Sequence, residues 1–106
     1  MSMDEALRAL ADGTRRRILA LVWEKERTAG EIAKGFSINR PAVSQHLGVL
    51  RASKLVTVRR AGTRCLYRAN HHAVVRLRAD LAAFWDVRLD RLKDAAEAAE
   101  HRKRRS

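Results

Sequence analysis

The sequence predicts a mainly α-helical protein with one small β-hairpin, built from five helices and two strands. Three observations indicate this fold class. Apolar residues recur at helical spacing in four short segments before residue 53. Apolar and polar residues then alternate between residues 56 and 68, as they do in strands. A long amphipathic stretch follows from about residue 71 to residue 97, which is typical of a final helix.

Two short helices are expected at the N-terminus, separated by Asp12-Gly13. The first extends from Met3 to Ala11, with Ser2 as its cap and two acidic residues at its positive end. Asp12 caps the second helix, which extends to about Glu24. We expect this second helix to be central to the core, because it has a wide apolar face formed by Ile18, Leu19, Leu21, Val22 and Trp23.

The next segment predicts a helix, a tight turn and a second helix. Thr28-Ala29-Gly30-Glu31 matches a capping box, and Gly35 ends the short helix that follows it. Asn39 then caps a helix from Arg40 to Ala52, with Pro41 in its first turn. Apolar residues at i, i+4 and i+7 predict its inward face, formed by Val43, Leu47 and Leu50. This arrangement is typical of a helix-turn-helix.

A β-hairpin is expected directly after it, in the position termed a wing. Val56–Arg59 and Cys65–Arg68 alternate as strands, and Arg60–Arg64 forms the connecting loop around Gly62. Asn70 caps the last helix, from His71 to about Glu97. We therefore divide the chain into a domain of residues 1–97 and a frayed basic tail of residues 98–106.

Charge indicates a polyanionic partner. The chain of 106 residues has 23 lysines and arginines against 12 acidic residues, a net charge of +11. The predicted wing holds four arginines and no acidic residue. A solubilising surface is the alternative, but mixed charge would serve that purpose equally well. Double-stranded DNA is the partner that this balance favours.

Side chains that can hydrogen-bond lie between the inward positions of the helix at 40–52. Gln45 can bond bidentately to adenine, whereas an arginine suits guanine or a phosphate. The alternative for Arg40, Ser44 and Gln45 is a solvated helix face. His46 can instead hold the second helix in place. Thr28 and Asn39 can serve as helix caps alone. Arg60 and Arg64 near the wing tip can reach phosphates. The candidate DNA-binding residues are Thr28, Asn39, Arg40, Pro41, Ser44, Gln45, His46, Arg51, Arg60 and Arg64.

An apolar stripe on the last helix predicts a homodimer. It is longer than one small domain can cover, so in a monomer it would be an exposed patch. Pairing with a second copy and with the first helix gives an isologous interface. The alternative, packing onto its own domain, accounts for part of the stripe. The candidate interface residues are Met3, Leu7, Leu10, Leu77, Leu81, Phe84, Trp85, Leu89 and Leu92.

These segments resemble the ArsR family of bacterial winged-helix repressors. The matching stretches are ALADGTRRRILALV at 9–22, Gly30–Ala33, PAVSQHLGVLR at 41–51, VTVRRAGTRCLYR at 56–68 and Leu81–Trp85. The resemblance implies a homodimer through the first and last helices, the fourth helix in the DNA major groove, and transcriptional repression, often of the protein's own operon. It covers nearly the whole chain in the family's order.

The sequence departs from the metal-sensing members of that family. Where those members have a Cys-x-Cys-type motif, this sequence has Thr28–Ala33, which contains no cysteine. The predicted last helix has histidines only at its start, His71 and His72. We therefore expect no metal site and no cofactor, and no inducer can be carried over. A redox or metal response through Cys65 or His71 and His72 is an alternative, although a buried structural role is the default for Cys65.

The sequence lacks the motifs that are typical of other classes of function. No nucleophile with a base and an orienting acid, no phosphate-binding glycine loop and no paired-carboxylate pocket is found, so we expect no enzyme. No apolar run approaches the roughly 20 residues of a membrane span. Acidic residues stand where a signal peptide would be basic. We expect a cytoplasmic, nucleoid-associated regulator; a non-specific architectural DNA-binding protein is the rival.

Overall fold

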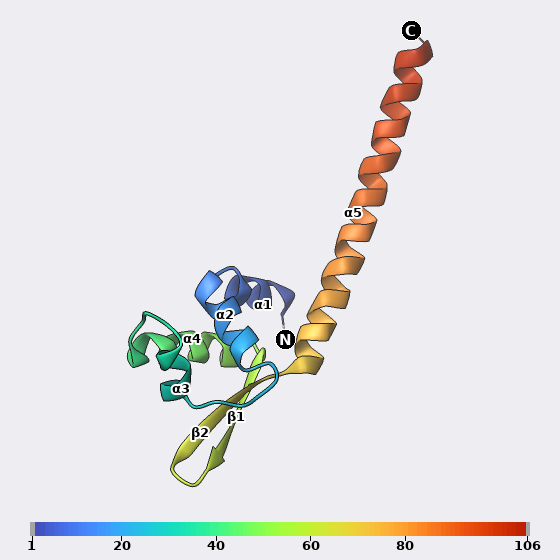
Figure 1. The fold of residues 1–106 in the computed structure, drawn as a ribbon. Helices are drawn as coiled ribbons and strands as arrows, with labels where there is room; N and C mark the ends of the chain where they lie inside the picture. Colours follow the sequence, from blue (N-terminus) through green and yellow to red (C-terminus); the bar gives the residue numbers. More distant parts are fainter. Residues whose placement is uncertain (1, 106) are drawn as a thin grey trace.

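The computed structural model describes residues 2–105 as a small helical domain with a projecting hairpin and a long C-terminal helix (Figure 1). The elements are α1 Met3–Leu10, α2 Gly13–Leu21, α3 Ala29–Lys34, α4 Arg40–Ala52, β1 Val56–Ala61, β2 Arg64–Ala69 and α5 His71–Arg105. Helices α1 to α4 gather beside the start of α5, whose C-terminal part extends away from them. The molecule is therefore elongated, measuring 73 × 27 × 20 Å.

The helix starts form as their capping residues predict. Side-chain oxygens of Asp12, Asn39 and Asn70 accept hydrogen bonds from the backbone N–H groups of Arg15, Ala42 and Ala73, respectively. The Thr28 hydroxyl accepts from the Glu31 N–H, and the Glu31 carboxylate accepts from the Thr28 N–H, which completes the capping box. Each bond satisfies a backbone donor that the first helical turn leaves open.

One apolar core joins the helices and the base of the hairpin. Its fully buried side chains include Ile18 and Val22 of the α2 segment, Ile32 of α3, and Val43, Leu47 and Leu50 of α4. The hairpin contributes Val56, and α5 contributes Leu77, which is 4% exposed. The predicted inward face of α4 is therefore confirmed. The prediction that Leu77 belongs to the exposed interface stripe is corrected, because its own domain already buries this side chain.

The hairpin is tied to the segment that precedes α3. Arg27 and Tyr67 exchange two backbone hydrogen bonds of 3.0 and 2.8 Å, and the Ala69 N–H donates to the Val22 carbonyl at 3.0 Å. The bond from Ala69 engages the carbonyl of Val22, the C-cap of α2, and α2 stops at Leu21 instead of the predicted Glu24. The wing therefore has a fixed base against the helix-turn-helix.

The hairpin turn is tighter than the sequence predicts. The strands reach Ala61 and Arg64, so only Gly62 and Thr63 connect them. Gly62 has φ 64°, the positive angle that two-residue hairpin turns require and that glycine adopts without strain. The predicted five-residue loop at 60–64 is therefore wrong, and Arg60 and Arg64 lie within the ladder next to the turn.

The predicted frayed tail is also wrong, because α5 continues to Arg105. Residues 93–105 are mostly alanine and charged residues with high helix propensity, and basic side chains near a helix C-terminus interact favourably with its dipole. Within residues 2–105, no helix combines the length and apolar character needed to cross a membrane.

Candidate DNA-binding surface

Helix α4 has one buried and one exposed face. Arg40, Ser44 and Arg51 fall on one exposed row, at relative positions i, i+4 and i+11, and Gln45 lies beside them. None of these four side chains has a hydrogen-bonding or ionic partner within residues 2–105. A row of free donors and acceptors on a helix with a rigid buried face is available to an external ligand.

A groove of about 430 Å³ brings together candidate residues that are far apart in the sequence. It lies between the start of α3, the start of α4 and the wing. Four of the ten candidate DNA contacts line it: Thr28, Arg40, Ser44 and Arg64. Thr63, Cys65 and Tyr67 also line this groove, and the sequence alone did not single them out as part of it.

Glu31 connects α3 to the wing at this groove. Its Oε1 atom accepts hydrogen bonds from the Thr28 N–H at 3.3 Å, the Thr28 hydroxyl at 3.1 Å and Arg64 Nη2 at 2.9 Å. The backbone bond from Thr28, followed by its hydroxyl and by Arg64, lowers the pKa of Glu31. The carboxylate is thereby held charged, and Arg64 is held beside the start of α3.

A second wing arginine on the same face of the hairpin as Arg64 is also paired. Arg59 forms a two-pronged ion pair with Glu26, and the hydrogen bond from Arg59 lowers the pKa of Glu26. Arg60, in contrast, has no side-chain partner among the described residues. The wing therefore has arginines that brace it and at least one that is free.

His46 lies apart from the exposed row. It is half-buried, and its Nδ1 atom is 3.5 Å from Arg15 Nη1 of α2. The guanidinium of Arg15 also donates to the carbonyls of Arg8 and Ala9 at the end of α1. This arrangement favours the interpretation in which His46 holds α2 in place.

Asn39 and Pro41 lie on the exposed start of α4. The Oδ1 atom of Asn39 accepts a hydrogen bond from the Ala42 N–H, so this acceptor is already used within the helix start. Pro41 carries no N–H and sits where that donor is not needed. Both residues shape the helix start more than they supply bonding groups.

The residues considered for metal or redox sensing, Cys65 and His71, have surroundings that differ from those of the DNA-binding candidates on α4. Cys65 is exposed near the hairpin turn, so the expectation that it is buried is wrong; this end of a two-stranded hairpin has no layer packed over it. His71 stacks on Trp23 with ring centroids 4.2 Å apart, and its Nε2 atom lies 2.6 Å from the Trp23 carbonyl oxygen. In the part of the chain that the structure describes, no three His, Cys, Asp or Glu residues are grouped to hold a metal.

The apolar stripe of α5 is uncovered beyond its first turns. Leu81 is half-buried, whereas Phe84, Trp85, Leu89 and Leu92 are exposed, Trp85 by 52%. Val75 and Val87 are exposed as well, but helical spacing places them outside this stripe. On α1, the candidates Met3, Leu7 and Leu10 are half-buried against the core. A folded monomer therefore leaves a row of large apolar side chains in water.

Comparisons with known proteins agree with this architecture. A family model described as a helix-turn-helix domain matches residues 10–59. The chain is 46% identical over 84 residues to the HTH-type transcriptional regulator Rv2034 of Mycobacterium tuberculosis, covering 79% of this chain and 78% of that protein. It is 37% identical over 68 residues to the transcriptional repressor SdpR of Bacillus subtilis, covering 64% and 76%.

Solved structures give the same result. The crystal structure of a possible transcriptional regulator for arsenical resistance superposes with a TM-score of 0.70 at 41% identity, covering 81% of this chain and 90% of that one. The homodimeric winged helix-turn-helix DNA-binding domain of Mb0332 from Mycobacterium bovis, a possible ArsR-family regulator, gives 0.65 at 36% identity, covering 78% and 77%. The chain therefore belongs to the ArsR family of winged helix-turn-helix DNA-binding transcriptional regulators.

Proposed function

We propose that the protein is a transcriptional repressor that binds an imperfectly palindromic DNA operator as a homodimer. The observation that carries this proposal is the groove at α3, α4 and the wing, which gathers Thr28, Arg40, Ser44 and Arg64. Two positively charged side chains and two hydroxyls on one surface suit phosphate and base edges. Relatives named as repressors support the direction of regulation.

Helix α4 supplies the base contacts in this proposal. Gln45 bonds an adenine, and Arg40 or Arg51 pairs with a guanine or a phosphate. Ser44 bonds a base or a phosphate. Backbone N–H groups near Thr28 and Asn39 lie close to the phosphate track, where the starts of α3 and α4 favour anions.

The wing supplies phosphate contacts. Arg60 has no protein partner, so its charge is available to the DNA backbone without breaking a bond. Arg64 reaches a phosphate while Glu31 retains its other side, since a guanidinium carries five N–H donors. These contacts contribute affinity that does not depend on sequence.

Dimerisation sets the spacing of the two α4 helices. The exposed α5 side chains Phe84, Trp85, Leu89 and Leu92 pair with a second copy, with α1 alongside. A two-fold dimer then presents α4 helices about 34 Å apart, the distance between successive major grooves on one face of DNA. The regulated site would include the protein's own promoter, and the protein would reside on the nucleoid.

Selection of bound sequences from a random DNA pool tests the proposal against its rival, a non-specific architectural protein. We expect enrichment of an inverted repeat and its loss in the double variant Ser44→Ala/Gln45→Ala. Thr57→Ala on β1, outside the proposed contacts, is the matched control and should enrich the same repeat. Binding without any enriched sequence in the wild type would favour the architectural protein.

A further inference from the structure

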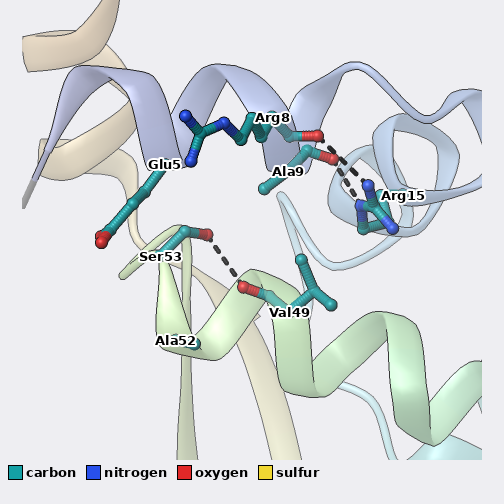
Figure 2. Close-up of a pocket in the computed structure, with 7 residues that line it drawn as sticks. All are labelled: Glu5, Arg8, Ala9, Arg15, Val49, Ala52 and Ser53. Carbon is teal, nitrogen blue, oxygen red and sulfur yellow. Dashed lines mark hydrogen bonds between the residues drawn. The ribbon is translucent and has the colours of Figure 1, made fainter.

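A second pocket lies between α1 and the end of α4, apart from the DNA-binding groove (Figure 2). Its volume is about 350 Å³, at the lower end of the range for small-molecule sites. Ala9 of α1 and Val49 of α4 point toward one another across it, and Ala52 continues the α4 side. Val49 is 42% exposed, whereas the other apolar side chains of α4 at Val43, Leu47 and Leu50 are at most 1% exposed.

The walls of the pocket offer an apolar surface and little neutral hydrogen bonding. The Ser53 hydroxyl donates to the Val49 and Leu50 carbonyls, at 3.0 Å each, so its proton is already used within α4. The side chains of Val49 and Ala52 are exposed on this side, whereas Ala9, which also lines the pocket, is only 1% exposed. An occupant therefore needs an apolar body.

One uncommitted cation borders the pocket. The guanidinium of Arg15 is engaged with the carbonyls of Arg8 and Ala9 and with His46. The side chain of Arg8 has no bonding partner among residues 2–105, and the same holds for Glu5. Two arginines against one glutamate favour an anion, and Glu5 disfavours a second negative charge on the occupant.

We propose that this pocket binds a small apolar monocarboxylate, with its carboxylate on Arg8 and its hydrocarbon part against Val49 and Ala52, which are exposed on this side. The hydrogen bonds of Arg15 connect the end of α1 to His46 of α4. An occupant of the pocket pushes α1 and α4 apart and thereby shifts α4 relative to α1. In the proposed dimer α1 lies at the interface, so this change alters the spacing of the two α4 helices. The occupant therefore weakens operator binding, an effect that rests on the proposed function.

Binding to the pocket is tested without DNA, by titrating the full chain with octanoate and following amide chemical shifts. We expect saturable shifts centred on residues 5–9 and 49–53, with 1-octanol binding about tenfold more weakly because it lacks the charge that Arg8 pairs. Arg8→Gln should weaken octanoate binding by about the same factor. Arg78→Gln, an exposed arginine of α5 outside the pocket, is the matched control and should bind as the wild type does.

Equal binding of octanoate by Arg8→Gln and the wild type, or shifts without saturation over the whole surface, would overturn the site. Because this measurement contains no DNA, its outcome is independent of whether the protein reads an operator. A second measurement adds octanoate to the protein bound to its selected DNA, and we expect the affinity for DNA to fall. Unchanged DNA affinity at saturating octanoate would overturn the regulatory role while leaving the pocket in place.

Discussion

Arg64 of the wing donates from Nη2 to Oε1 of Glu31 at 2.9 Å, and the two residues are 33 positions apart in the sequence. The same carboxylate oxygen caps the start of α3 through Thr28. A single acidic side chain therefore fixes both the helix that precedes α4 and the strand that borders the DNA-binding groove. The position of the wing arginine is coupled to the formation of α3.

Replacing Thr28 with alanine removes the side-chain half of the capping box. The Glu31 N–H then loses its acceptor, and we expect the free energy of unfolding to fall by about 1 kcal/mol. Urea denaturation measures this change. Thr28→Ser retains the hydroxyl and is the control; a loss as large as that of alanine would show that capping is not the cause.

The pKa of Glu31 is lowered in the folded protein by the backbone bond from Thr28 and then by its hydroxyl and by Arg64. A lowered pKa means that the folded state favours the charged carboxylate, so its stabilisation is complete above the ordinary glutamate value and is lost as the pH falls through the lowered one. We therefore expect the stability of Glu31→Gln to fall less steeply in acid than that of the wild type. Urea midpoints measured between about pH 7 and about pH 3 test this.

Glu97→Gln, which changes a glutamate on exposed α5 outside this network, is the control for the acid titration. It should follow the wild-type curve. Identical acid limbs for Glu31→Gln and the wild type would contradict the assignment of Glu31 as a titrating group that stabilises the fold.

Gln45→Ala should cost about 1–3 kcal/mol in binding to the selected operator and relax preference at one base pair. The reason is that a bidentate side chain on the exposed face of α4 is removed without changing the buried face. Fluorescence anisotropy against the operator and its single-base variants measures both effects. Equal weakening on operator and random DNA would remove Gln45 from the base contacts.

Replacing Arg60 with glutamine should weaken binding to all DNA and reduce the slope of log affinity against log salt by about 0.9. Arg64→Gln should also weaken binding to all DNA and should reduce the salt slope by up to about 0.9, the value for one phosphate contact. Arg76→Gln, which removes an exposed arginine of α5 outside the wing, is the matched control. An unchanged salt slope in the Arg60 variant would exclude it from the phosphate contacts.

The capping residues and the inward face of α4 could be predicted because they depend on residues a few positions apart. Asp12, Thr28 and Asn39 each bond a backbone N–H three residues later, and Val43 and Leu47 are separated by one helical turn. Local spacing carries this information directly. The order of the elements, including the wing, follows from the same short-range patterns.

The contacts that complete the site are long-range and could not be predicted in this way. No local sequence pattern links Arg64 or Arg59 to an acidic partner, yet Glu31 and Glu26 engage them. Arg15 reaches His46 across 31 positions, which distinguishes His46 from its neighbour Gln45. The end of α2 was misplaced for the same reason, since Ala69 of β2 bonds the Val22 carbonyl.

Sedimentation velocity of the protein mixed with a duplex carrying one selected inverted repeat tests the central claim most directly. The exposed α5 stripe predicts two protomers on each duplex, and Trp85→Glu, which places a charge in the centre of that stripe, should sediment as a single chain and bind the repeat weakly. A wild-type complex with a single protomer on each repeat would contradict the dimer that positions the two α4 helices.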